Sequence, residues 1–223
     1  MIDYTIISSG SDGNAVVVNR SILIDCGVPF KSLATSAGDL RHVLLTHIHG
    51  DHFNPATVRR LAAERPTLRF GGGAWMVEPL LDAGVRKANI DVLNAGRAYK
   101  FRFGTVIPVP LVHNVPNQGY KLHLPGGKMI YATDTGTLNG ISAKDYDLYL
   151  VEANYEDEEI RERIRQKQKA GDYAYEIHAM HNHLSKKRCD DWIYSNIGPT
   201  GEYVYMHQHR ARGEEREVLN RGI

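Results

Sequence analysis

The sequence contains little cysteine, no long apolar run and no excess of charge of either sign. Its two cysteines, Cys26 and Cys189, lie far apart and form no CxxC pair, so we expect reduced thiols rather than a disulfide. No segment approaches the roughly 18 apolar residues that a membrane span requires. The opening residues, MIDYTIISSG, also lack the basic and then apolar order of a secretory signal. These absences predict a cytoplasmic protein with no membrane partner.

The charge balance is close to neutral, with 27 lysines and arginines against 26 aspartates and glutamates, for a net charge of +1. This balance argues against a broad basic face that coats long nucleic acid. The 223 residues, of which 42% are hydrophobic and 24% charged, suit a single domain over residues 1–223. Histidine is the abundant residue, with 11 copies, and a histidine surplus suggests metal or proton chemistry.

Short apolar and β-branched runs alternate with helical segments along the chain. Strands are predicted at 4–8, 15–18, 22–25, 42–46, 101–103, 105–109, 120–124, 128–132, 147–151 and 202–206, and a glycine turn at 71–73. Helices are predicted at 54–64, where Asn54 is the N-cap, and at 75–81, 155–169 and 186–196. This order favours an αββα sandwich, an α/β fold of two mixed β-sheets flanked by helices. A doubly wound parallel sheet is the weaker alternative, because many strands follow one another directly.

The string His47-Ile48-His49-Gly50-Asp51-His52 directly follows an apolar strand. It places three imidazoles and a carboxylate within six residues, and these groups are preferred by zinc and by harder ions such as manganese. Four such ligands exceed the number that one catalytic zinc needs while keeping an open position. The sequence therefore predicts two divalent metal ions, with zinc first and manganese as the alternative.

The HIHGDH string resembles the HxHxDH motif of the metallo-β-lactamase-fold hydrolases. The resemblance implies an αββα sandwich and assigns His47 and His49 to one metal, and Asp51 and His52 to the other. Three further ligands would each follow a predicted strand: His113 for the first metal, Asp134 as the bridge and His207 for the second metal. His209 is the alternative to His207 if the last strand ends one alternation later.

Three other strings are similar to the ribonuclease Z-like phosphodiesterase branch of this family. They are SSGSDGN followed by LIDCG, the string HNVPNQGY that begins at His113, and the triplet His183-Leu184-Ser185. The resemblance gives His183 the role of general acid, and Ser185 also suits the N-cap of the next helix. The GHTPG-type string typical of thioester and lactam hydrolases is absent from the sequence.

Short intervals between these motifs favour a small substrate. His113 and Asp134 are 21 positions apart, which leaves no room for a tRNA-binding arm, and the 49 positions from Asp134 to His183 exclude a large nucleic-acid clamp. The sequence most resembles the phage-type anti-Pycsar phosphodiesterases, which open cyclic mononucleotides. That likeness implies attack on phosphorus by a metal-bridging hydroxide, with Asp51 orienting or deprotonating the water and His183 protonating the leaving oxygen.

Two other functions stay open at this point. One is a nuclease, an exonuclease or ribonuclease Z-like enzyme acting on DNA or RNA ends. The other is a hydrolase of another class, or a protein whose metals are structural. Tyr173 and Tyr175 are candidates for stacking on a nucleobase. The resemblance also implies a homodimer, in the cytosol of a bacterium or of a phage-infected cell.

Overall fold

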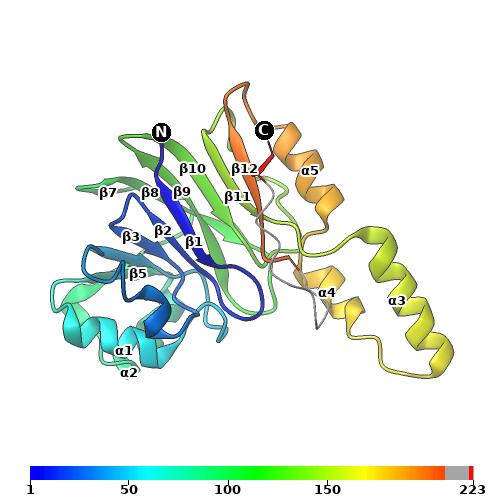
Figure 1. Cartoon of the computed structure of the whole chain (residues 1–223), viewed down its shortest axis with the longest axis horizontal. Coiled ribbons are helices and arrows are strands. Elements are labelled where there is room, and N and C mark those ends of the chain that lie inside the picture. The colour runs from blue at the N-terminus through cyan, green and yellow to red at the C-terminus, as the bar shows by residue number, and fades with distance from the viewer. Residues whose placement is uncertain (209–220, 223) are drawn as a thin grey trace.

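The computed structural model describes residues 1–208 and 221–222, and within them two β-sheets pack face to face (Figure 1). The first sheet has six strands in the order β1-β2-β3-β4-β5-β6. Their bounds are Tyr4–Ser8 (β1), Ala15–Val18 (β2), Ile22–Ile24 (β3), His42–Leu44 (β4), Arg69–Gly72 (β5) and Ile90–Val92 (β6). Strands β1 to β3 pair antiparallel and β3 to β6 pair parallel, so the sheet is mixed.

The second sheet has seven described strands in the order β13-β12-β11-β10-β9-β8-β7. Their bounds are Tyr99–Phe101 (β7), Gly104–Leu111 (β8), Asn117–Leu124 (β9), Gly127–Ala132 (β10), Leu148–Glu152 (β11), Glu202–Met206 (β12) and Arg221–Gly222 (β13). Strands β10, β11 and β12 pair parallel, and the remaining pairs are antiparallel. As a result β8, β10, β11 and β12 all run in the same direction.

The two-residue alternation of β3 shows how the layers form. Ile22 and Ile24 point into the core between the two sheets, while Leu23 points to the core on the outer face of the first sheet. Helices α1 (Pro55–Glu64) and α2 (Val77–Asp82) cover that outer face, and α5 (Lys186–Tyr194) packs on the outer face of the second sheet. The predicted αββα sandwich is confirmed.

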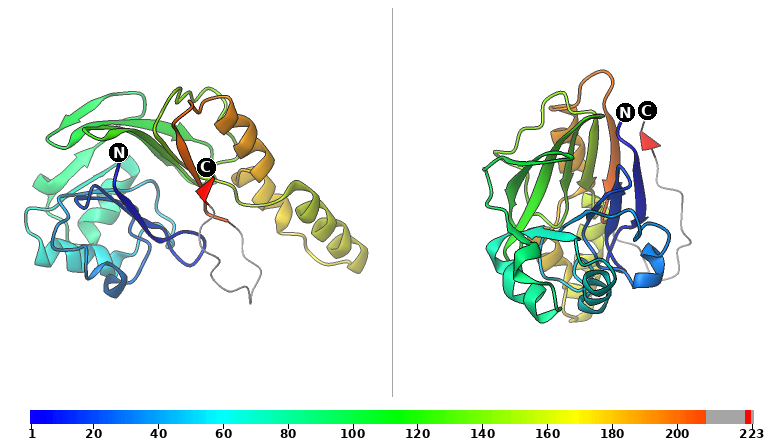
Figure 2. Two further views of the ribbon diagram at one scale, coloured as in Figure 1. Left: turned by 45° about the horizontal axis from the view of Figure 1, so that its top comes forward. Right: turned by 90° about the vertical axis from the view of Figure 1, so that its left-hand side faces the viewer.

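Helices α3 (Asp157–Ala170) and α4 (Glu176–Asn182) extend away from the sheets beyond α5 (Figures 1 and 2). The charges at its two ends stabilise helix α3. Three acidic residues occupy its first turn and two lysines its last, an order that complements the helix dipole. Gly171 closes α3 with a φ of 75°, the left-handed conformation that glycine adopts readily. The described residues also form three short 3₁₀ helices: η1 (Phe30–Leu33), η2 (Ala74–Met76) and η3 (Lys87–Asn89).

Two local predictions were wrong. The glycine turn predicted at 71–73 is wrong, because Gly71 and Gly72 end strand β5, paired with β4 and β6, and Gly73 precedes η2. Gly71 is glycine for lack of space, since a Cβ there would lie 2.8 Å from Leu93 Cδ1. The strand expected at 101–103 ends at Phe101, since the pairing of Phe101 with Gly104 leaves a two-residue turn. Strand β6 and helix α4 were not predicted. Asn54 does cap α1, accepting hydrogen bonds from two backbone N–H groups.

Candidate metal centre

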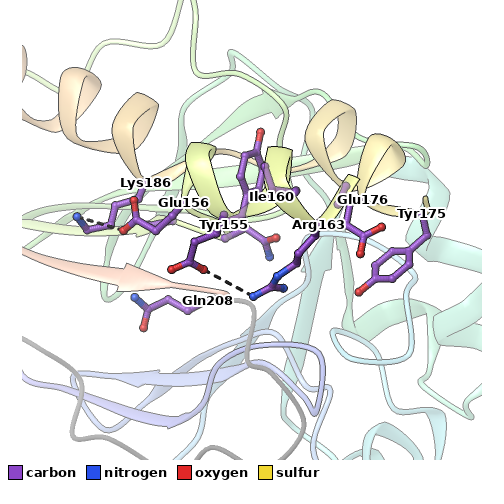
Figure 3. Close-up of a pocket in the computed structure, with 12 residues that line it drawn as sticks. Tyr155, Glu156, Ile160, Arg163, Tyr175, Glu176, Lys186 and Gln208 are labelled. Atoms are coloured by element: carbon purple, nitrogen blue, oxygen red, sulfur yellow. Dashed lines mark ion pairs between the residues drawn. The ribbon is translucent and has the colours of Figure 1, made fainter. Parts of the chain in front are cut away.

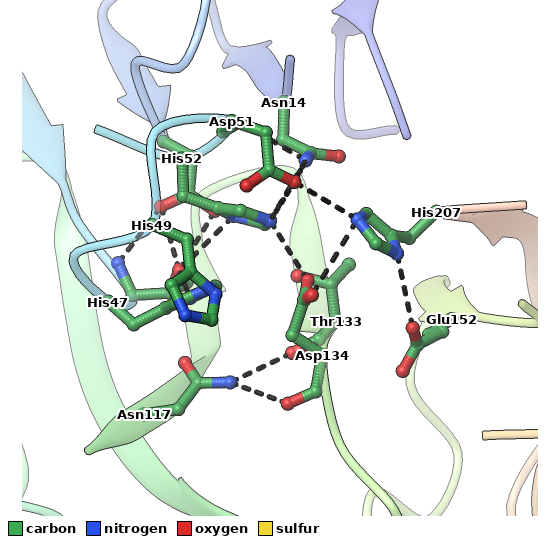
Figure 4. A network of polar contacts seen from close by, with 12 residues as sticks. Asn14, His47, His49, Asp51, His52, Asn117, Thr133, Asp134, Glu152 and His207 are labelled. Atoms are coloured by element: carbon green, nitrogen blue, oxygen red, sulfur yellow. Dashed lines mark hydrogen bonds and ion pairs between the residues drawn. The ribbon is translucent and has the colours of Figure 1, made fainter. Parts of the chain in front are cut away.

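The carboxyl ends of strands from both sheets meet at one edge of the sandwich, and most of the histidine-rich positions lie there (Figure 4). The loop after β4 carries the HIHGDH string. His113 lies just beyond β8, Asp134 just beyond β10, and His207 follows β12 directly. Because these strands run in the same direction within each sheet, residues far apart in the chain come together.

The first group of side chains is a three-histidine cluster of His47, His49 and His113. His49 Nδ1 lies 3.1 Å from His47 Nε2 and 3.3 Å from His113 Nε2. Tetrahedral zinc with Zn–N bonds of about 2.0–2.1 Å separates its nitrogen ligands by about 3.3 Å. Three imidazole nitrogens at these separations can therefore surround one such ion.

The second group is a mixed cluster of Asp51, His52, Asp134 and His207. His52 Nε2 lies 2.9 Å from Asp134 Oδ2 and 3.4 Å from Asp51 Oδ2. His207 Nε2 lies 3.2 Å from Asp51 Oδ2 and 3.6 Å from Asp134 Oδ1. Asp134 Oδ1 is also 3.8 Å from His113 Nε2, so the Asp134 carboxylate stands between the two clusters.

The backbone is unusual at this edge. Asp25, Asp134 and His207 have φ values of 57°, 59° and 50°, in a left-handed region that non-glycine residues seldom occupy. Such conformations persist where surrounding contacts hold them, and they often gather at functional sites. Gly27 allows the Asp51 loop to approach closely, since a Cβ there would lie 1.8 Å from the Asp51 carbonyl oxygen.

A buried carboxylate, Asp25, orients the histidine string from behind. Its Oδ2 lies 2.7 Å from His52 Nδ1, and its Oδ1 accepts hydrogen bonds from the backbone N–H and the hydroxyl of Thr46, both at 2.9 Å. Tyr131 also donates to Asp25 Oδ2, at 3.1 Å. The Thr46 hydroxyl lies 3.0 Å from His47 Nδ1. Asp25 therefore holds His52 directly and His47 through Thr46, with the Nε2 atoms turned toward the clusters.

A second buried carboxylate, Glu152, acts similarly at the other side of the centre. Its Oε1 lies 2.6 Å from His183 Nδ1 and 3.2 Å from His207 Nδ1. Its Oε2 accepts hydrogen bonds from the backbone N–H groups of Thr135 and Leu184. Glu152 is the last residue of β11 and is fully buried, so it fixes two imidazole rings against the rigid sheet.

The two clusters differ in the charge that their surroundings favour. Burial, aided by the neighbouring imidazoles, lowers the pKa of His47 to about 2, so its ring is neutral as a ligand must be. In the mixed cluster burial opposes charge on Asp134, yet His52 and His207 hold its pKa well below the usual range. Burial would also lower the pKa of His207, but Asp134 and its other carboxylate neighbours raise it to about 10. The mixed cluster thus attracts positive charge.

The surroundings of one buried oxygen, Asp134 Oδ2, indicate whether a cation fits in the mixed cluster. Asp134 Oδ2 is buried, and His52 Nε2 faces it at 2.9 Å, a contact that is favourable when the His52 ring is protonated. His52 Nδ1 already faces Asp25, so in the neutral ring Nε2 directs a lone pair at that oxygen. Two electron-rich atoms at this distance repel each other unless a proton or a metal ion lies between them. The mixed cluster therefore fits a divalent cation.

All seven predicted metal ligands come together at this edge, and His183 lies beside them, its Nδ1 3.7 Å from Asp134 Oδ1. Tyr175, the N-cap of α4, and Tyr173, just before it, belong to neither cluster, and both are exposed. His209 falls outside the described residues.

Sequence reasoning missed Asn14, Asp25 and Glu152 as parts of the site. Asn14 is fully buried, and its amide nitrogen lies 2.9 Å from His52 Nε2 and 3.3 Å from Asp51 Oδ2. A signal was present for the two acids. Asp25 directly follows the apolar strand β3 and Glu152 ends β11, and a charge at the end of a buried strand requires a partner.

A two-sheet sandwich with histidine and aspartate clusters at its strand ends defines a metallo-β-lactamase fold. The chain belongs to the beta-lactamase superfamily, whose domain matches residues 20–189. Within the part of the chain that the structure describes, no helix combines the length and the apolar character needed to cross a membrane.

Several solved structures share the fold at low sequence identity. The metallo-beta-lactamase fold protein YhfI from Bacillus subtilis aligns with a TM-score of 0.71 and 16% identity, over 94% of this chain and 87% of that chain. The short form of human tRNase Z aligns with a TM-score of 0.71 and 15% identity, over 94% and 93%. A diphosphatase from the PhnP family aligns with a TM-score of 0.63 and 17% identity, over 94% and 88%. A search of curated protein sequences finds no match.

Proposed function

We propose that this protein is a dinuclear-metal phosphodiesterase that hydrolyses cyclic mononucleotides, as anti-Pycsar enzymes do in immune evasion. The observation that carries the proposal is the placement of the His183–Glu152 pair beside the two ligand clusters. An alkoxide leaving group needs a proton as it departs. His183 lies near the clusters and is not one of the seven predicted metal ligands, so it is free to supply that proton. Similarity to human tRNase Z and to a PhnP-family diphosphatase supports phosphoester chemistry.

The three-histidine cluster would hold one divalent ion and the mixed cluster the other, with Asp134 between them. The donor set favours zinc, with manganese as the alternative. When bound, a pair of such ions lowers the pKa of water and polarises a phosphoryl oxygen. Asp51, partly exposed at the rim of the mixed cluster, would orient or deprotonate the attacking water.

The proton for the leaving sugar oxygen comes from His183. Burial opposes its charged form, but Glu152 raises the pKa of His183 above its ordinary value. The His183 ring is about one-fifth exposed, so its outer edge can reach a substrate while Nδ1 stays fixed on Glu152. This arrangement gives a proton donor of fixed direction, as general acid catalysis requires.

A nuclease acting on DNA or RNA ends is the second candidate, and the similarity to human tRNase Z favours it. The near-neutral net charge and the short intervals between motifs favour the small substrate. We also propose that residues 1–223 form one domain and that the protein is a cytoplasmic homodimer.

The test is a substrate panel with purified protein loaded with zinc or manganese. Cyclic UMP, CMP, AMP and GMP are compared with labelled single-stranded and duplex oligonucleotides, and product is followed by chromatography. We expect linear nucleotide from at least one cyclic substrate, and loss of that product in Asp134→Ala. Tyr99→Phe, far from the clusters on β7, is the matched purification control.

Degradation of oligonucleotides without action on any cyclic nucleotide would replace the proposal with the nuclease. Full activity after exhaustive chelation, verified by metal analysis, would overturn both metal-based functions.

A further inference from the structure

A cavity of about 140 Å³ lies next to the metal centre, between α3, α4 and the segment that follows β11 (Figure 3). A volume of this size is well above the minimum that one water molecule needs, so the cavity can admit a small planar group. Twelve residues line the cavity, among them Asn154, Ile160, Tyr175, Glu176, Ala179 and Gln208. None of these residues belongs to the predicted metal ligands.

Glu176 is the unusual residue of this cavity. Its side chain is only 5% exposed, and its Oε1 lies 2.7 Å from Lys167 Nζ. Its Oε2 is buried and has no hydrogen-bond partner among the described residues. Burial opposes its charge, yet Lys167 keeps the pKa of Glu176 below its usual value. An ionised, buried oxygen without a donor is costly, and a ligand that brings an N–H group would satisfy it.

The other charged residues of the lining already have partners. Arg163 lies 3.6 Å from Glu159, and Lys186 lies 3.4 Å from Glu156. The unmet requirement of the cavity is therefore a single hydrogen-bond donor, directed at Glu176.

An aromatic surface adjoins this carboxylate. Lys167 Nζ, which contacts Glu176, also lies 4.1 Å from the centroid of the Tyr175 ring, so the ring and the carboxylate are neighbours. The Tyr175 ring is partly exposed and lines the cavity, while Ile160 and Ala179 add apolar surface. A planar ring that carries an N–H donor matches both features.

The cavity is connected to the metal centre at two points. Asn154 donates to the carbonyl of His207 at 2.8 Å, and its amide nitrogen lies 3.2 Å from His207 Nδ1. Helix α4 runs from Glu176 to Asn182, whose carbonyl oxygen lies 3.0 Å from His113 Nδ1, and His183 follows. Seven helical residues span about 9–10 Å, which is the scale of a mononucleotide from phosphate to base edge.

We propose that this cavity receives the nucleobase of the substrate and that Glu176 selects bases bearing an exocyclic amine over uracil. The proposal rests on the proposed function, in which the leaving sugar oxygen lies beside His183 and the nucleoside extends toward α4. Cytosine presents a 4-amine where uracil presents a carbonyl oxygen, beside the ring N3–H of uracil. With the 4-substituent rather than N3 facing Glu176 Oε2, the cytosine amine donates to that oxygen and the uracil carbonyl is repelled. Tyr175 stacks on either base.

The sharpest test compares cyclic CMP with cyclic UMP, whose bases differ at that one exocyclic group. We expect a lower KM for cyclic CMP in the wild type, and in Glu176→Gln a rise of about tenfold or more for cyclic CMP with little change for cyclic UMP. Tyr175→Leu should raise KM for both nucleotides alike. Bis(p-nitrophenyl) phosphate, which has no base, should be hydrolysed equally by all three proteins.

Glu162→Gln is the matched control, because Glu162 lies on α3 but bonds to Arg165 and Gln166 rather than lining the cavity. Equilibrium dialysis of labelled cytidine and uridine against chelator-treated protein provides a readout without catalysis. Preferential cytidine binding that is lost in Glu176→Gln supports the inference whatever the reaction turns out to be.

The failures are distinguishable. If no cyclic nucleotide is hydrolysed but cytidine still binds through Glu176, the proposed function is wrong and the base site stands. If cyclic nucleotides are hydrolysed but Glu176→Gln leaves both KM values and cytidine binding unchanged, the base site is wrong. Loss of bis(p-nitrophenyl) phosphate hydrolysis in Glu176→Gln would also overturn it, because the residue would then act on the metal centre.

Discussion

Replacement of Asp25 by asparagine should weaken metal binding by the mixed cluster without removing any of its ligands. Asparagine, like aspartate, tolerates the left-handed backbone at this position, so Asp25→Asn changes the side-chain charge with little backbone cost. Its oxygen can still accept from the backbone N–H and the hydroxyl of Thr46. Its amide nitrogen then takes the place of Oδ2 and faces His52 Nδ1, which is 2.7 Å away in the wild type.

The contact between residue 25 and His52 Nδ1 decides how far the metal affinity falls. Two N–H groups cannot face each other at hydrogen-bond distance, so His52 must move its proton to Nε2, the atom that points into the mixed cluster. A protonated Nε2 cannot bind a metal. Loss of such an orienting partner typically lowers metal affinity by about 10–100-fold, equivalent to about 1.4–2.7 kcal/mol. The three-histidine cluster should be affected less, because Asp25 reaches His47 only through Thr46.

The assay is competition with a chromophoric zinc chelator, which reports the stoichiometry and the affinity of each ion. We expect one tight and one weakened zinc in Asp25→Asn. Tyr131→Phe is the control: it removes one hydrogen bond to the same carboxylate and keeps the charge, so both affinities should stay within about threefold. Two zinc ions bound by Asp25→Asn with wild-type affinity would refute the tautomer argument.

Three other predictions concern the general acid, the bound ions and a buried histidine away from the metal centre. His183→Ala should lower kcat by about 10²–10⁴-fold for a phosphodiester with an alkoxide leaving group but by little for a p-nitrophenyl ester, and an equal loss on both would contradict a general acid. Zinc at about 100 times its Kd should stabilise the protein by about 2.7 kcal/mol, so chelation should lower the unfolding midpoint unless the clusters bind no ion. His42 packs edge-on against the stacked rings of Phe101 and Phe103 and has no hydrogen-bond partner on Nδ1 within the described structure. Burial lowers the pKa of His42 despite Asp91 nearby. The folded state therefore binds a proton at His42 less readily than the unfolded state, so the free energy of unfolding falls as the pH drops below about 6.5. In urea titrations at pH 5 and pH 8, His42→Phe should show a smaller fall than the wild type. An unchanged pH dependence would contradict this prediction.

Left-handed backbone at Asp134 and His207 adds a physical reason for the site's rigidity. Both residues follow strands of the second sheet and turn away from the strand direction toward the clusters. Ligands held in this way need little rearrangement to bind an ion, which reduces the entropy lost on binding.

The sequence alone was sufficient for the local parts of the fold and for the ligand types. The strands at 15–18 and 202–206 and the cap at Asn54 follow from interactions between near neighbours, and all appear as predicted. The HIHGDH string marks a metal-binding loop because four ligand groups lie within six residues. The resemblance it carries also indicated where His113, Asp134 and His207 would come from.

Tertiary structure alone decided which distant groups meet. Asp25 and His52 are 27 positions apart, and Glu152 is 31 positions from His183, so no local pattern pairs them. Strand β5 forms at a glycine-rich segment because it pairs with β4 and β6, and tertiary packing against Leu93 leaves no room for a side chain at Gly71. Helix α4 and the cavity beneath Glu176 depend on the docking of α3 beside them. Local energies select the elements and the ligand types, whereas burial and packing between sheets select the partners that orient them.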